Sequence, residues 1–197
     1  MNRTFLRGAV LFVIAFALSN LAFLAQVKAV DPTDIFYGTG AGNGTTTGFY
    51  DSAFGFNALN GVTSGSFNTA SGAYALYFNT TGSFNTASGY NALYVNSAGN
   101  NNAASGAYAL NSNTTGSYNT ASGDSALYSN TTGGFNAANG AFVLYSNTTG
   151  NFNTAAGPGA LFSNTTGSNN VAIGTTAGFA LTTGSGNVCI GAGVNGV

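Results

Sequence analysis

The sequence predicts an all-β fold, a parallel β-solenoid (β-roll) with one coil for each 17-residue repeat. Two columns of glycine carry this prediction. The first recurs every 17 residues from Gly38 to Gly191, and the second follows ten residues behind it, from Gly48 to Gly184. The consensus Gly-x-x-Ala-Leu-Tyr-Ser-Asn-Thr-Thr-Gly-Ser-Phe-Asn-Thr-Ala-Ser runs through these columns without insertion or deletion. A disordered chain has no reason to keep such register, whereas a stacked repeat array does.

The length of the repeat selects the architecture. A pair of helices needs about 33 residues and a leucine-rich repeat about 20 to 29, and Gly, Asn and Thr are poor helix formers. Two short strands joined by two tight turns fit 17 residues, with glycine where the backbone needs positive φ or a close approach. At about 4.8 Å per coil, nine coils make a rod of roughly 40 Å. The predicted turn glycines are Gly72, Gly89, Gly106, Gly123, Gly140, Gly157 and Gly174.

The N-terminal segment, residues 1–29, reads as an export signal peptide. Arg3 and Arg7 precede an apolar stretch, and small residues at Val27 and Ala29 favour cleavage after Ala29. The alternative is an uncleaved membrane anchor, because the stretch of about 18 residues is near the lower limit for a span. We therefore expect a secreted, extracellular or cell-surface protein with no transmembrane domain after cleavage. Residues 30–37 would then be a cap or a strand donated to a neighbouring subunit, and residues 38–197 a solenoid of nine repeats plus a partial tenth.

The Asn-Thr-Ala-Ser segment predicts a strand whose alternate residues face inward. Its third position holds only small residues, alanine in most coils and Cys189 in the last, as a narrow interior requires. Cys189 is then a small buried residue, the alternative being a reactive thiol. The asparagine of the segment lies on the same face, and stacked amides would form a hydrogen-bonded ladder. That ladder is predicted at Asn68, Asn85, Asn102, Asn119, Asn136, Asn153 and Asn170.

Two adjacent apolar columns predict an assembly surface. One holds leucine and the next tyrosine or phenylalanine, and neighbouring residues of a regular strand cannot both face inward. An exposed apolar stripe marks an interaction surface, so we expect identical rods to pack laterally, around a threefold axis. The alternative is a bend that tucks both columns inside. A third apolar line runs through Phe67, Phe84 and Tyr118. The predicted assembly stripe comprises Leu76, Leu93, Leu127, Leu144, Tyr77, Tyr94, Tyr128 and Tyr145.

The last coils contain Asn-Val-Ala-Ile-Gly at residues 170–174 and Asn-Val-Cys-Ile-Gly at residues 187–191. These segments resemble the signature of the left-handed parallel β-roll in the heads of trimeric autotransporter adhesins, and the longer repeat is similar to bacterial surface and tail-fibre-like proteins. The resemblance covers residues 38–197 and implies a left-handed coil and an elongated, extracellular, adhesive homotrimer. The repeat is longer than the head repeat of that family.

The function expected from these features is non-enzymatic self-assembly, as a homotrimer or an end-to-end filament, into a cell-surface or secreted fibre. Partners would be other copies of the chain and a host or matrix surface. Uncapped coil ends expose backbone groups that can template a further subunit. The alternative is a monomeric ligand-binding solenoid. Thr69 and Ser71, with their equivalents in other coils, would present hydroxyls to ice, and the Tyr/Phe stripe would stack on carbohydrate.

Composition excludes several other classes. The three basic residues all lie within the first 28 positions, which argues against nucleic-acid binding. Histidine is absent and cysteine occurs once, so neither a histidine base nor a cysteine–histidine metal site is expected, and we predict no cofactor. Asp51 and Asp124 are too far apart along the rod to act as one acid–base pair. Asn-Thr-Thr at five turns is interpreted as turn chemistry, with glycosylation as the alternative.

Overall fold

The computed structural model describes residues 27–28, 32–44 and 47–194, and throughout these ranges the protein is all-β. The chain forms a parallel β-solenoid of about nine turns with 17-residue coils, as predicted. Its short strands are β1 (Val27–Lys28), β2 (Ile35–Tyr37), β3 (Ser52–Phe54), β4 (Thr69–Ser71), β5 (Thr86–Ser88), β6 (Ala103–Ser105), β7 (Thr120–Ser122), β8 (Ala137–Asn139), β9 (Thr154–Ala156), β10 (Val171–Ile173) and β11 (Val188–Ile190).

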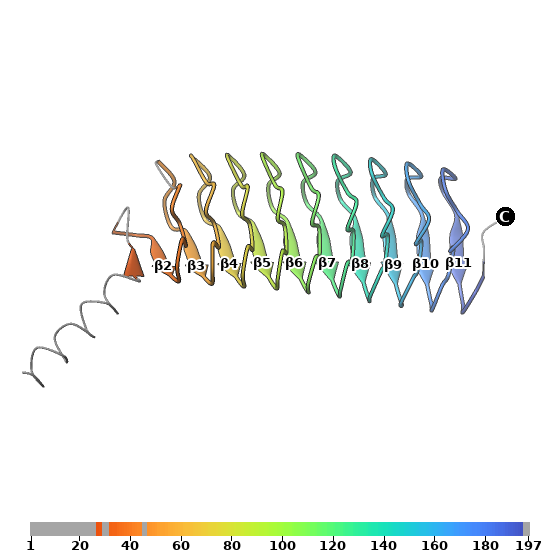
Figure 1. Ribbon diagram of the computed structural model, residues 1–197. Coiled ribbons are helices and arrows are strands. Elements are labelled where there is room, and N and C mark those ends of the chain that lie inside the picture. The colour runs from red at the N-terminus through yellow and green to blue at the C-terminus, as the bar shows by residue number, and fades with distance from the viewer. Residues whose placement is uncertain (1–26, 29–31, 45–46, 195–197) are drawn as a thin grey trace, which may run out of the picture.

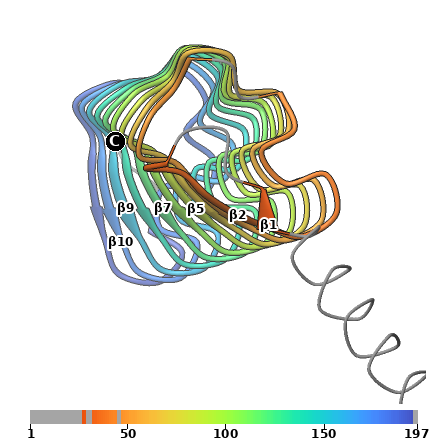
Figure 2. The ribbon, with the colours of Figure 1, turned by 90° about the vertical axis from the view of Figure 1, so that its left-hand side faces the viewer.

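Strands β2 to β11 form one parallel sheet in sequence order, and the register never shifts. Ala70 pairs with Ala87, and Ala87 pairs with Ala104, so each residue lies beside its equivalent in the next repeat. Figure 1 shows the resulting rod, with the strands side by side along its length. Viewed along the axis, the coils superimpose on one another with a gradual twist (Figure 2).

Each coil contains one strand. The prediction of a second strand around the leucine column is wrong. That side of the coil is a series of turns, with an isolated bridge between Phe78 and Val95 in the described chain. The backbone has positive φ at two alternate positions there, for example 58° at Tyr74 and 49° at Leu76. Left-handed backbone is unfavourable for residues with a side chain, by roughly 1–2 kcal/mol. It bends the chain so that successive side chains no longer alternate between faces.

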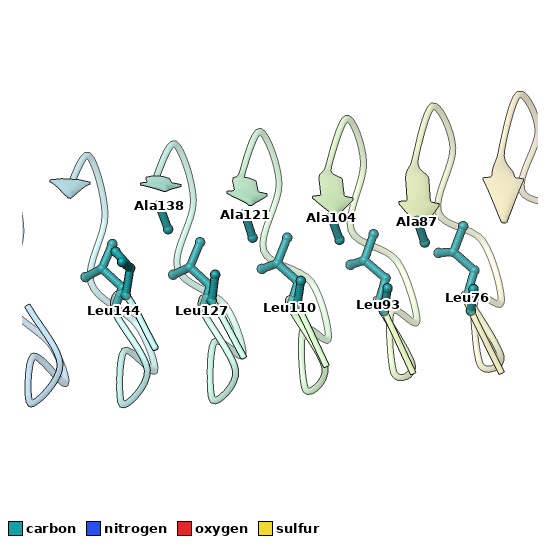
Figure 3. Close-up of a cluster of buried hydrophobic side chains, with 14 of the residues drawn as sticks. Leu76, Ala87, Leu93, Ala104, Leu110, Ala121, Leu127, Ala138 and Leu144 are labelled. Atoms are coloured by element: carbon teal, nitrogen blue, oxygen red, sulfur yellow. The ribbon is translucent and has the colours of Figure 1, made fainter. Parts of the chain in front are cut away.

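This bend places the leucine column in the core. Ala75 and Leu76 follow each other in sequence and are both fully buried. Figure 3 shows the leucines of successive coils facing the strand alanines across the interior. Leucines therefore cannot be part of a surface stripe, and the prediction that Leu76, Leu93, Leu127 and Leu144 belong to an assembly surface is wrong. Each is instead stacked against its equivalents and against the alanine column.

The N-terminal lead segment is the first rung of the solenoid. β2 pairs in parallel register with β3 of the same chain, so residues 35–37 continue the repeat. Phe36 occupies the strand position that is alanine in the following coils, and it is fully buried. Its ring lies where a Cβ on Gly42 would be, and Gly42 stands where later coils have leucine. β1 pairs antiparallel with the outer edge of β2.

The opposite end is closed in a similar way. Gly178 replaces leucine in the last full coil, and Leu181 packs against the buried cluster from three residues further along. A Cβ on Gly178 would lie 2.9 Å from Leu161 Cδ2 and 3.3 Å from Leu181 Cδ1, which shows how closely these side chains fill the space. At each end of the rod, a large side chain from another position of the coil thus fills the space of the missing leucine.

The two glycine columns are required for different reasons. The first has positive φ, for example 135° at Gly72, where a Cβ would also lie 2.6 Å from the carbonyl oxygen of Gly89. The predicted turn glycines all share this left-handed backbone, with φ between 117° at Gly157 and 140° at Gly89. The second column requires glycine because there is no space for a side chain, not because of its φ. A Cβ on Gly99 would collide with the Gly116 carbonyl and with the side chains of Asn96 and Asn113.

Candidate functional site

One exposed surface follows the whole parallel sheet and includes the aromatic residues that precede most of its strands. We call this surface the sheet face; it comprises the first and third residues of strands β2 to β11 and the residue two positions before each strand from β3 onward. Thr and Ser hold both outward positions in β4, β5 and β7, and Phe or Tyr lies two positions before six of the nine strands from β3 to β11. At the two ends of the rod the hydroxyls give way to exposed apolar side chains. These are Ile35, Tyr37, Phe54, Ile173, Val188 and Ile190.

The aromatic column of the sheet face is stacked along the rod. Phe67 and Phe84 have ring centroids 4.9 Å apart and nearly parallel planes. Phe135 stacks on Tyr118 at 4.7 Å and on Phe152 at 5.0 Å. These rings are about half exposed, 56% for Phe84. Because stacking covers the ring faces, the column presents ring edges to its surroundings. This is the third apolar line noted in the sequence, and it has greater exposure than the tyrosines named as the assembly stripe.

Those tyrosines lie on another side of the coil and are half-buried. Tyr77 stacks on Tyr94 at 5.3 Å, and Tyr128 stacks on Tyr145 at 5.1 Å. Tyr145 continues the stack to Phe162. With the leucines buried beneath them, these rings form the outer layer of the core rather than a free stripe. The structure therefore separates the two columns that the sequence analysis joined.

The predicted asparagine column forms a buried ladder. Asn85 donates from Nδ2 to Asn68 Oδ1 at 3.2 Å, and its backbone N–H donates to the same oxygen at 3.0 Å. The side-chain bond recurs at 3.1 Å from Asn136 to Asn119 and from Asn170 to Asn153. Each Oδ1 thus accepts from the next coil. The ladder satisfies polar groups in a core too narrow to admit a second sheet.

A second buried ladder was missed by the sequence analysis, which interpreted its residues as turn chemistry. Asn96 donates from Nδ2 to Asn79 Oδ1 at 2.7 Å, and Asn113 donates to Asn96 Oδ1 at 2.6 Å. The amide of Asn96 also donates to the Gly99 carbonyl at 2.9 Å, which accepts from Asn85 of the first ladder as well. The signal was present in the sequence, because these residues keep strict register. They are Asn79, Asn96, Asn113, Asn130, Asn147 and Asn164.

Two aspartates, Asp34 and Asp51, extend the first ladder toward the N-terminus. Asp51 N–H donates to Asp34 Oδ1 at 2.8 Å, and Asn68 N–H donates to Asp51 Oδ1 at 2.8 Å. Both carboxylates are buried, and Oδ2 of each has no hydrogen-bond partner. Burial raises the pKa of Asp51 to about 6, against the lowering effect of the bonds from Asn68.

The remaining expectations from the sequence concern the single cysteine, metal sites and the N-terminal segment. Cys189 is a free thiol, fully buried among the core residues. Within residues 27–28, 32–44 and 47–194, no three His, Cys, Asp or Glu side chains gather as a metal centre would require. No helix in that part of the chain has the length and apolarity of a membrane span. Apart from β1, the predicted signal peptide lies outside the described residues.

Searches of protein-family models, of curated proteins and of solved structures each found no match to this chain.

Proposed function

We propose that the protein is a non-enzymatic, extracellular structural repeat protein that associates with copies of itself through the sheet face. The observation that carries the proposal is the uncharged sheet face, whose aromatic column is stacked in two runs separated by Asn101. Large exposed apolar patches mark interaction surfaces in proteins. Because the coils keep one register, a second copy aligned with the first would meet a matching row of aromatic rings along residues 50–84 and 118–152.

The electrostatics of the chain favour such association. The sequence carries three basic and four acidic residues, a formal net charge of −1 at pH 7. Two of the acidic residues, Asp34 and Asp51, are buried. Little charge repulsion therefore opposes close packing of two rods. Exposed Ile35 and Phe54 at one end of the sheet face, and Ile173, Val188 and Ile190 at the other, extend the apolar surface to the ends of the rod. Both a closed trimer and an open filament use this chemistry, and the resemblance to trimeric adhesin heads favours the trimer.

The proposal is tested by placing charge on the sheet face and measuring the mass of the particle by light scattering. We expect Phe84→Asp combined with Phe135→Asp to dissociate the assembly. Phe142→Asp is a matched control, because Phe142 is exposed but lies on a different side of the coil. All three positions have φ of 57–58°, a conformation that aspartate tolerates well, so each variant should fold. Assembly unaffected by the double variant would remove the sheet face as the interface.

A second candidate function is ice binding by the hydroxyl rows. Thr69, Thr86 and Thr120 are exposed on the sheet in register with one another, as such a surface requires. The threonine row is interrupted at Ala103 and Ala137, and it is bordered by protruding aromatic rings. Inhibition of ice recrystallisation by the purified protein would favour this function. Loss of that inhibition in Thr86→Tyr would place the activity on the sheet face.

A further inference from the structure

A cavity of about 240 Å³ lies between neighbouring tyrosines on the turn side of the coil. It is lined by Tyr74, Tyr90, Asn91 and Tyr94. Tyr74 and Tyr108 occupy the same position in their coils, and Asn91 is the equivalent residue of the coil between them. The amide of Asn91 is shorter than a phenol ring, so a gap remains between Tyr74 and Tyr108.

The tyrosines around this gap meet at steep angles, unlike those of the stacked columns. The ring of Tyr74 makes an angle of 85° with Tyr90, at a centroid distance of 6.3 Å. It makes an angle of 68° with Tyr94, at 6.4 Å. Tyr90 is about half exposed and also meets Tyr108 edge-on. Tyr94 also stacks on Tyr77, so the cavity is bounded by rings in several orientations.

The polar group in the lining is held firmly but is unpartnered. The backbone of Asn91 is fixed by its N–H, which donates to the Ala73 carbonyl at 3.1 Å, and by its own carbonyl, which accepts from Asn111 Nδ2 at 3.2 Å. Its side-chain Oδ1 is buried without a hydrogen-bond partner. Buried polar atoms are nearly always paired, so this exception requires an explanation. Among the ladder asparagines, the Oδ1 of Asn164 also lacks a partner, because the next coil has Leu181 at that position.

We propose that this cavity binds a single ring of a neutral saccharide. No residue of the lining carries a charge at neutral pH, which favours a neutral ligand. Tyrosine rings offer apolar surface to the C–H face of a sugar, and their hydroxyls offer donors and acceptors to its hydroxyl groups, with Asn91 beside them in the lining. Cavities for drug-sized ligands span roughly 300–1,000 Å³, so the smaller volume here fits one ring, as a terminal or branching unit. The proposal is independent of self-assembly through the sheet face.

The test is an NMR titration of the full chain with methyl glucoside, methyl galactoside and N-acetylglucosamine, following the tyrosine ring signals and saturation transfer to the sugar. At least one of these probes should bind and shift the signals of Tyr90 and Tyr94. Tyr90→Leu should weaken binding roughly tenfold, as expected for loss of an aromatic wall. Tyr118→Leu is the matched control, since Tyr118 is an exposed tyrosine of the sheet face, and it should leave binding unchanged.

A second variant addresses the amide. Asn91→Gly keeps the left-handed backbone, where φ is 54°, and removes the side chain. It should also weaken binding roughly tenfold, while Asn57→Gly, at the equivalent position two coils earlier, should have no effect. The proposal is overturned if none of the three saccharides binds at 20 mM. It is equally overturned if tetramethylammonium binds at these tyrosines while the saccharides do not, which would make the site a cation cage.

Discussion

At the scale of single residues, asparagine links the coils of this protein. Its amide is both donor and acceptor, so one residue type can repeat indefinitely along a column, with each Oδ1 accepting from the coil that follows. Aspartate has the same shape but lacks the donor. In the first ladder, Asp51 Oδ2 lies 3.0 Å from the position of a Cβ on Gly48, and Asn187 Nδ2 lies equally far from a Cβ on Gly184. Asp51 therefore places an acceptor where the ladder uses a donor.

This mismatch predicts that stability falls as pH rises. The pKa of Asp51 is about 6 in the folded protein against an ordinary value of 3.8. The folded state holds the proton of Asp51 more tightly than the unfolded chain does. The contribution of this carboxyl to the free energy of unfolding is therefore fully present below about pH 4, and it is lost as the pH rises from about 4 to 6. This difference between the two pKa values corresponds to a loss of about 3 kcal/mol in the free energy of unfolding at neutral pH. Asp51→Asn should restore the donor, raise the free energy of unfolding at pH 7 and remove this pH dependence.

Urea denaturation between pH 4 and 8 measures the effect. Asp124→Asn provides the control, because Asp124 is exposed and its replacement leaves the ladder intact. A stability curve for Asp51→Asn that runs parallel to that of the unmodified chain would show that the carboxyl is not the source of the pH dependence. Asp34 is the charged neighbour acting on Asp51 and contributes repulsion when ionised.

The second ladder makes a prediction about glycosylation. Asn79, Asn113 and Asn130 begin Asn-Thr-Thr sequences, but all three are fully buried with their amides in hydrogen bonds to the next coil. A glycan on Nδ2 would remove a donor and has no room in the core. When the folded chain is exposed to a glycosylating system, intact mass spectrometry should find these asparagines unmodified. A folded, fully glycosylated product would contradict the ladder.

At the scale of the element, the corner built from left-handed residues decides what lies inside. The left-handed backbone at the leucines is unfavourable in itself. It is offset because it lets Ala and Leu at successive positions both reach the core. Leu110→Ala should lower the free energy of unfolding by about 2–5 kcal/mol, the usual effect of such a cavity. Ser112→Ala, in the same turn but half-buried, should change it by less than about 1 kcal/mol. Thermal unfolding of the two variants compares them directly; equal stability would show that the leucine column is not the core.

The same corner explains what sequence reasoning could and could not predict. Repeat length, strand position and the inward Asn and Ala columns follow from period and alternation, and the structure has them where they were expected. The leucine column was misplaced because alternation assumes a regular strand, and no glycine marks the left-handed residues Tyr74 and Leu76. The second asparagine ladder was overlooked because Asn-Thr-Thr-Gly is also ordinary turn chemistry.

At the scale of the whole molecule, each end of the rod departs from the repeat. Phe36 at one end and Leu181 at the other fill space left by glycine in the leucine column. The sequence predicted the N-terminal segment to be separate from the repeat because its residues differ in type, although its spacing keeps the register. Between the ends, the exposed aromatic column remains the feature that the single chain does not use for its own folding.

The central claim is that this exposed face joins copies of the chain, and sedimentation equilibrium over a range of concentrations tests it most directly. One chain of 197 residues has a mass of 19.6 kDa. We predict a particle several times the mass of one folded chain, a fixed multiple for a closed trimer or a mass that grows with concentration for a filament. A particle with the mass of one chain at every concentration would contradict the account.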